Sequence, residues 1–237
     1  MRTKAIVIII LVFGPKLFAQ ISSIDAIGGV GQSFRVLSNE NMRAFEEPKI
    51  SWKAGLNLNI ELGKTIELKT GLAHTQVSYY EMIIRDVRWP SEHDGNGGFL
   101  DDPSLPNDIK FSLNYRFIEL PVDFRFEFLE GKWQPYLELG FSMMLYRATK
   151  ATQTTEFGIV SNISKESNVS EISFFGNAAF GVNYQITNEF QLFMQGGYQE
   201  QLNQLKSLSI DERLFQYGVV FGFRKLMNLE RSTSKEN

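Results

Sequence analysis

The feature that most constrains the fold is a strict alternation of apolar and polar side chains between Phe117 and Phe128. Every second residue from Ile118 onward is apolar, and the residues between them are Glu119, Pro121, Asp123, Arg125 and Glu127. Successive side chains point to opposite faces of a β-strand, so the segment predicts a strand with one apolar and one charged face. A helix would mix the two sets, because its side chains repeat every 3.6 residues.

The same period recurs along the chain and predicts eight strands. They are expected near residues 23–36, 50–60, 66–80, 117–128, 137–145, 171–186, 189–200 and 215–224. Tight links at 62–65, 130–132 and 187–189 alternate with long links near 37–48, 81–111, 150–170 and 201–212. In an antiparallel meander this alternation places every long loop at one end, which is typical of outer-membrane barrels.

Alternation alone fits two kinds of barrel. A soluble, lipocalin-like barrel keeps its apolar side chains inside, whereas a membrane barrel turns them outward. Glycines fall mostly in the polar phase, which faces the interior of a membrane barrel. A narrow barrel has little interior room, so small residues are expected there. These glycines are Gly55, Gly71, Gly140, Gly181, Gly218 and Gly222. Several strands also exceed ten residues, enough for a tilted crossing of the hydrocarbon core.

Aromatic residues near the predicted strand ends also favour the membrane barrel. They are Trp52, Tyr79, Tyr80, Trp133, Tyr136, Tyr146 and Tyr198. Their positions are typical of the interfacial girdles of membrane proteins. We therefore expect an all-β fold, an eight-stranded antiparallel up-and-down transmembrane β-barrel with short periplasmic turns and long outer loops.

The polar phase predicts a charge network inside this barrel. Its members are expected to be Lys53, Glu67, Lys69, Glu119, Asp123, Arg125, Glu127 and Glu138. Buried charges are costly unless they are paired, so these side chains should pair across strands. A catalytic cluster of carboxylates and cations would have the same composition, but small barrels fill their interiors with side chains and the structural interpretation is preferred. A barrel packed in this way has no open channel.

The first residues predict export. Arg2 and Lys4 precede the apolar run Ala5–Phe13, and a small residue follows at Ala19. This is the layout of a secretory signal peptide, whose apolar run is too short to span a bilayer as a helix. We expect a signal peptide at 1–20 cleaved near Ala19, a barrel domain at 21–226 and a polar tail at 227–237.

Composition excludes several classes of function. The chain has no Cys, which removes disulfides, thiolate metal sites and cysteine nucleophiles. Three of its 24 basic residues and none of its 27 acidic residues lie in the expected signal peptide, so the mature chain is acidic. A nucleic-acid partner is therefore not expected. The expected partners of a membrane barrel are first of all outer-membrane lipids.

The segment Tyr115–Val122 resembles the Bacteroidetes outer-membrane β-barrel proteins often labelled PorT-family. The matching positions are Phe117, Glu119 and Pro121 in the middle strand, then Pro135, Tyr136 and Gly140 after a short turn. The resemblance implies an outer-membrane barrel, and it suggests assistance to a secretion or surface-assembly machine. Other outer-membrane or secretion-machinery proteins are the partners that the resemblance implies. A mid-strand proline lacks a ladder donor, so we also expect a bulge or a local pairing break at Pro121.

Candidate sites for chemistry are sparse. A lipid-modifying barrel enzyme would need a serine, a histidine and an acid together, but His74 and Ser78 are about 13 Å apart along one strand. Asp94, Asn96, Asp101 and Asp102 in the loop 81–110 resemble calcium ligands, although such clusters are usually turns. We expect a non-enzymatic protein with a structural or binding role and no cofactor. The alternatives are a lipid-modifying barrel enzyme and a soluble lipocalin-like carrier.

Overall fold

A computed structural model of the chain describes residues 21–37, 46–85, 90–93, 99–102, 104–163, 170–203 and 212–227. The expected signal peptide and all of the expected tail except Met227 lie outside these residues. Within the described residues no helix is long and apolar enough to cross a membrane.

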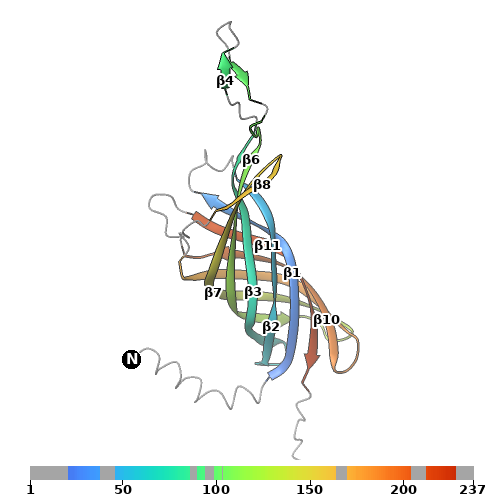
Figure 1. The fold of residues 1–237 in the computed structure, drawn as a ribbon. Coiled ribbons are helices and arrows are strands. Elements are labelled where there is room, and N and C mark those ends of the chain that lie inside the picture. The colour runs from blue at the N-terminus through green and yellow to red at the C-terminus, as the bar shows by residue number, and fades with distance from the viewer. Residues whose placement is uncertain are drawn as a thin grey trace, which may run out of the picture.

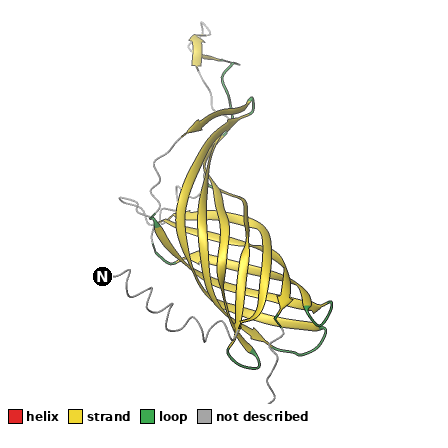
Figure 2. Cartoon of the chain, turned by 60° about the horizontal axis from the view of Figure 1, so that its bottom comes forward, coloured by secondary structure: helices red, strands yellow, loops and turns green. Residues whose placement is uncertain are grey.

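Eight long strands form a closed antiparallel ring (Figure 2). They are β1 (Ile21–Leu37), β2 (Glu47–Glu61), β3 (Ile66–Ile84), β6 (Ile109–Glu127), β7 (Trp133–Thr155), β9 (Ile172–Gln185), β10 (Phe190–Gln201) and β11 (Glu212–Leu226). Each strand pairs with its neighbours in chain order, and the ring closes where β1 pairs with β11 from Ser23–Leu226 to Leu37–Glu212. The predicted eight-stranded up-and-down barrel is confirmed.

Short turns and both described chain ends lie at one end of the barrel (Figure 1). The backbone N–H of Met227 donates to the carbonyl oxygen of Ser22 at 2.8 Å, which joins the last strand to the first. The tight β6–β7 turn contains Gly131 with a φ of 132°, a conformation that side chains with a Cβ rarely adopt. The strand ends that lead into the four long connections lie at the opposite end, which we call the outer end.

Three further strands lie in the outer connections, where alternation did not predict any. β4 (Pro90–His93) pairs with β5 (Phe99–Asp101), and β8 (Gly158–Ile163) forms a hairpin with the end of β7. β3, β6 and β7 are also longer than predicted, at 19, 19 and 23 residues. Together with β8 they rise beyond the rest of the barrel as one sheet (Figure 1).

The polarity of the wall is that of a membrane barrel. Large apolar side chains on its outer face are exposed, among them Val30, Leu56 and Phe180 at 60–62%. Charged side chains in the opposite phase are buried, and Asp25 and Arg125 are both 0% exposed. The barrel therefore spans the membrane with its strands, as outer-membrane proteins do, and the soluble lipocalin-like alternative is wrong.

The predicted aromatic girdles are only partly correct. Trp52, Trp133 and Tyr198 are exposed on the outer wall, as girdle residues should be. Tyr79 and Tyr136 are fully buried, however, and Tyr146 packs against a buried apolar cluster. Tyr136 and Tyr146 share the polar, inward phase of β7, so strand position alone was a poor guide to where these rings point.

Pro121 causes the expected local break in pairing. The β3–β6 ladder runs from Ala73–Glu119 to Thr70–Val122 without pairs at Leu120 and Pro121, although its register does not change. On the other side of β6, Pro121 pairs with Ser142, and that ladder is continuous from Phe117 to Glu127. The absence of a backbone N–H at Pro121 thus interrupts only the β3–β6 ladder, at Leu120 and Pro121. The β-bulges of β6 and its neighbours lie elsewhere.

The outward polarity predicts how the wall tolerates charge. Replacing Leu56 by Arg should lower the free energy of unfolding in phospholipid vesicles by about 2–4 kcal/mol, because an arginine near the bilayer midplane loses its hydration. Leu105, which is 40% exposed in an outer connection, supplies the control, since Leu105→Arg stays in water. Urea titrations followed by tryptophan fluorescence measure both. Equal stability of the Leu56→Arg variant and the wild type would contradict a lipid-facing wall.

Candidate functional site

The lumen gathers the charged side chains of the polar phase. All eight expected members of the network point inward, from β2, β3, β6 and β7. Lys69, Glu119, Asp123, Arg125 and Glu138 are each at most 6% exposed. The structure therefore brings these eight side chains together in two linked groups, and an apolar cluster forms a third group beside them in the lumen.

Arg125 is the centre of the group nearest the short turns. Its guanidinium forms ion pairs with Glu138 at 2.5 Å, with Glu67 at 3.7 Å and with Asp25 at 3.8 Å. The guanidinium carbon also lies 4.3 Å from the centre of the Tyr136 ring. Stacking on an aromatic face suits a weakly hydrated, planar cation and adds to the ionic contacts.

Two members of this group were missed by the sequence analysis, Asp25 and Arg224. Arg224 holds Asp25 through two hydrogen bonds of 2.8 and 3.2 Å and reaches Glu67 at 3.2 Å. Asp25 shares the inward phase of Ser23 and Ser33 in β1, and Arg224 follows Gly222 in the inward phase of β11. That phase was the signal for both, but glycines obscure the alternation in β1, and Arg224 ends the predicted strand 215–224 in the polar phase without having been counted in the network.

Lys69 connects this group to the middle of the lumen. Its ammonium group pairs with Asp123 at 3.1 Å and with Glu138. Asp123 in turn accepts a hydrogen bond from the Asn177 side chain at 2.9 Å. Because Asn177 also bonds to Ser142 and Gln199, the chain of contacts continues without a gap from β3 to β10.

Glu119 is the acceptor at the centre of the second group. Lys53 lies 3.3 Å from both of its oxygens, and Thr75, Ser142 and Gln199 donate to it at 2.5, 2.9 and 2.8 Å. A fully buried carboxylate is stable only when it is paired and hydrogen-bonded in this way. With its oxygens occupied by four donors, Glu119 is built as a structural acceptor.

Two aromatic rings fill the space that lumenal glycines leave. The Tyr136 ring lies over Gly181 and the Phe193 ring over Gly222, on the neighbouring strand in each case. A Cβ at Gly181 would lie 2.5 Å from the Tyr136 hydroxyl oxygen, and one at Gly222 would lie 2.1 Å from a Phe193 ring carbon. Both glycines are therefore required by packing, as the narrow interior predicts.

An apolar cluster forms the third group, toward the outer end. Its buried members are Val77, Tyr79, Leu113, Tyr115, Phe117, Met144, Ala151, Phe175 and Leu214. The hydroxyl groups of Tyr79 and Tyr115 share a hydrogen bond of 3.2 Å, and Arg35 lies 4.9 Å from the centre of the Tyr79 ring. This cluster packs the lumen with side chains below the outer loops.

A cavity of about 70 Å³ remains in the lumen. Its lining includes Lys53, Asn57, Arg125 and Gln216. The space has room for only a few water molecules, and the side-chain oxygens of Asn57 and Gln216 have no hydrogen-bond partner within the protein. The cavity is thus suited to water that satisfies these groups rather than to a substrate.

The residues of the PorT-like motif are mostly lumenal. Phe117 belongs to the apolar cluster, Glu119 is the central acceptor and Pro121 lines the cavity. On β7, Tyr136 carries the Arg125 contact, and a Cβ at Gly140 would lie 2.3 Å from the carbonyl oxygen of Val122. Pro135 precedes Tyr136 in the opposite phase of β7. The motif thus describes how this barrel packs.

The candidate chemical sites are separated from one another. His74 lies against Trp52 on the outer wall, with ring centres 5.1 Å apart. Ser78 accepts a hydrogen bond from Gln76, and in the described part of the chain none links His74 to a serine or an acid. Asp102 accepts two hydrogen bonds from Ser104, which lower the pKa of its carboxyl group.

The calcium hypothesis is left largely untested. Asp94 and Asn96 lie outside the described residues. For His93 and Asp101 the structure describes the backbone alone. Asp102 acts as a turn residue, since it bonds only two positions ahead. Among the side chains that are described, no three histidines or acids gather in an arrangement that could hold a metal ion.

Comparison with known proteins returns outer-membrane barrels. No family model and no curated protein matches the sequence. The fold is similar to neisserial surface protein A (13% identity, TM-score 0.40, 86% of this chain and 97% of that one). It is also similar to OprG of Pseudomonas aeruginosa (13%, 0.41, 88% and 97%) and to Ail of Yersinia pestis (12%, 0.37, 86% and 99%).

The buried network predicts an unequal response to the loss of two arginines. Arg125→Met removes the cation that contacts Glu138, Glu67 and Asp25 together and leaves only Arg224 and Lys69 beside these buried acids, so the free energy of unfolding should fall by about 3–5 kcal/mol. Arg213→Met removes an exposed pair with Glu200 and should cost at most about 1 kcal/mol. Urea unfolding in vesicles compares them, and similar costs for the two variants would contradict a structural network.

The aromatic contacts predict a second matched pair. Gly222→Ala places a methyl group against the Phe193 ring and should cost about 1–3 kcal/mol through overpacking. Gly28→Ala meets no atom within 4 Å and should leave stability nearly unchanged. The same unfolding assay measures both. A neutral Gly222→Ala variant would show that Phe193 moves aside freely.

Proposed function

We propose that this protein is a non-enzymatic outer-membrane scaffold that binds another protein at the cell surface. The observation that carries the proposal is the sheet of β3, β6, β7 and β8 beyond the barrel rim (Figure 1). A barrel needs no such extension to span a membrane, so the residues of this sheet serve a function other than membrane insertion.

The packed lumen supports a role outside the barrel. Ion pairs, the Glu119 contacts and the apolar cluster fill most of the interior, and the cavity between them has a volume of only about 70 Å³. Transport of a solute would require these groups to separate. Binding at the surface requires no change in the lumen.

The far edge of β8 is suited to binding an extended peptide. β8 pairs with β7 on one side, and in the described part of the chain no strand pairs with its other side. An unpaired strand edge presents backbone donors and acceptors to which a partner strand can add. At the tip of the same hairpin, the apolar side chain of Phe157 is 66% exposed to water. Phe157 would provide an anchor beside that edge.

The PorT-like motif suggests what kind of protein binds there. PorT, the barrel that gives this family its label, is implicated in assisting a secretion or surface-assembly machine, and the proposed partner is accordingly a component of such a machine. The motif residues themselves pack the lumen, so this finer proposal is supported by the resemblance and by the outer sheet together. A lipid-modifying enzyme has no comparable support, since His74 lies beside Trp52 and not beside a serine.

Site-specific photo-crosslinking in native outer membranes tests the proposal. A benzophenone amino acid at position 157 should capture one defined protein that the same probe at Leu62 does not capture. Leu62 is the matched control, because it is 53% exposed in the β2–β3 turn at the opposite end of the barrel. Replacing residues 156–163 by a short glycine–serine turn should remove the partner from detergent pull-downs.

Two results would overturn the proposal. One is recovery of the wild-type barrel alone, with no crosslink from position 157. The other is a partner retained in full by the variant that lacks the β7–β8 hairpin. The heat-dependent gel mobility typical of folded membrane barrels shows in either case that the ring has formed.

A further inference from the structure

The apolar outer wall ends at the same level on three adjacent strands. His74, Ile118 and Leu145 are cross-strand neighbours on β3, β6 and β7. One outward position further from the short turns, the side chains become Gln76 on β3 and Arg116 on β6. On β7 a register shift beside Arg116 leaves Arg147 without a partner residue on β6, and both arginines are exposed.

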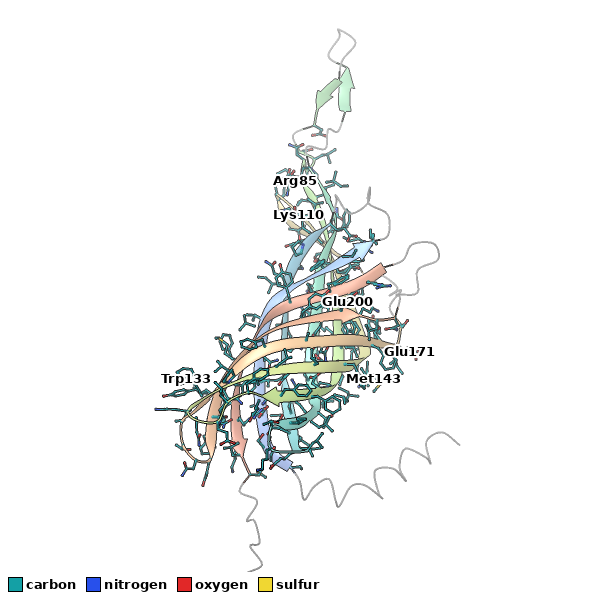
Figure 3. All side chains as sticks on the ribbon, turned by 180° about the vertical axis from the view of Figure 1, so that it is seen from behind. Arg85, Lys110, Trp133, Met143, Glu171 and Glu200 are labelled. Carbon is teal, nitrogen blue, oxygen red and sulfur yellow. The ribbon has the colours of Figure 1, made fainter. Side chains whose placement is uncertain are left out.

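Further cations continue this surface along the outer sheet. Lys150 pairs with Asn114 in the β6–β7 ladder, and Lys110 pairs with Thr154. Lys49 reaches across from β2 and donates to Ser112 at 3.0 Å and to Asn114 at 3.1 Å. We call these five residues, Lys49, Lys110, Arg116, Arg147 and Lys150, the basic patch. Figure 3 shows Lys110 on the strands that rise above the barrel, whereas Trp133 lies at the other end.

The basic patch lies on the opposite face of the sheet from the apolar cluster. Leu113, Tyr115 and Phe117 occupy the inward phase of β6 and belong to that cluster. Lys110 and Arg116 occupy the other phase, which continues downward into Ile118 and Phe124 of the lipid-facing wall. The patch is therefore a direct upward continuation of the membrane-facing surface.

No carboxylate neutralises the basic patch within the described residues. Three other described cations at the outer end are paired: Arg85 with Glu47 at 2.8 Å, Arg213 with Glu200 at 3.5 Å, and Arg35 with Glu46. The charges of Lys49 and Lys150 are instead close enough to repel each other. Such a concentration of cations in a chain with an acidic excess is not a consequence of composition.

We propose that the basic patch binds the phosphate-bearing headgroup of a lipid in the outer leaflet. Arginine suits this task because its planar fork of donors matches phosphate oxygens. The hydroxyl groups of Ser112 and Thr152 share a hydrogen bond of 2.7 Å beside Lys49, which leaves one hydroxyl proton as a neutral donor. Cations that lie at headgroup level attract anionic lipids in proportion to their number.

The apolar wall below the basic patch indicates that the bound molecule is a lipid rather than a free phosphate ion. A headgroup held by Arg116 and Arg147 places its acyl chains along the outward residues of β6 and β7. These begin with Ile118 and Leu145 and continue to Met143 and the 47% exposed Phe141. A soluble anion would gain nothing from this apolar surface. The inference depends on the membrane location and not on the proposed protein partner.

Native mass spectrometry of the full barrel in detergent tests the inference. The probe is a diphosphorylated glycolipid of the lipid A type, and phosphatidylcholine is the zwitterionic comparison. The triple variant Arg116→Gln, Arg147→Gln, Lys150→Gln should bind the glycolipid at least about tenfold more weakly than the wild type. The control triple Arg85→Gln, Lys132→Gln, Arg213→Gln removes the same charge elsewhere and should bind as the wild type does.

Three outcomes overturn the inference. They are unchanged glycolipid binding by the patch variant, an equal loss in the control variant, and displacement of the glycolipid by millimolar inorganic phosphate. The last would show a site for a free anion. Should the triple variant fail to fold, Arg116→Lys with Arg147→Lys keeps the charge and removes the bidentate fork. It should bind the glycolipid less tightly than the wild type, and equal binding would also contradict the proposal.

Discussion

The constraint on which the structure depends is that backbone donors and acceptors inside a membrane must find partners within the protein. Strands satisfy it only in a closed ring, and here the ring closes through the β1–β11 and β6–β7 ladders. Closure imposes a two-residue period on every spanning strand, because alternate side chains face lipid and lumen. It also explains how Pro121 is tolerated, since the interruption is confined to one side of β6 while the β6–β7 ladder is continuous at Pro121.

A ring of eight strands is narrow, and this determines what its lumen can hold. The inward phase carries charge, so each cation needs a carboxylate in reach, and Arg125, Arg224 and Lys69 share acids from four strands. Glycines at positions 181 and 222 make room for the rings that flank Arg125. An interior packed in this way stabilises the wall and leaves little room for a solute. Functional surfaces are therefore expected at the outer end and on the lipid-facing side.

The ring and the inward phase could be predicted because both follow from alternation. The eight charged residues of that phase, from Lys53 to Glu138, could be named from the sequence for this reason. Asp25 was missed because the glycines at 28, 29 and 31 dilute the pattern of β1. The outer sheet was not predicted because alternation fails where register shifts: beside Arg116 on β6–β7, and between Pro48 and Trp52 on β2–β3. Tyr136 shows a further limit, since an aromatic ring at a strand end serves a girdle or a lumen equally well.

These register shifts connect the two proposals. Beside Arg116 the shift adds one residue to β7 and brings Arg147 to the outer face just above Leu145. Beyond it, β7 leaves β9 and pairs instead with β8, so the free strand edge follows the exposed cations along β7 toward the outer end. A lipid held by the basic patch would fix the base of the outer sheet against the membrane. The β8 edge would then stand at a defined height, which lowers the entropic cost of capturing a partner strand.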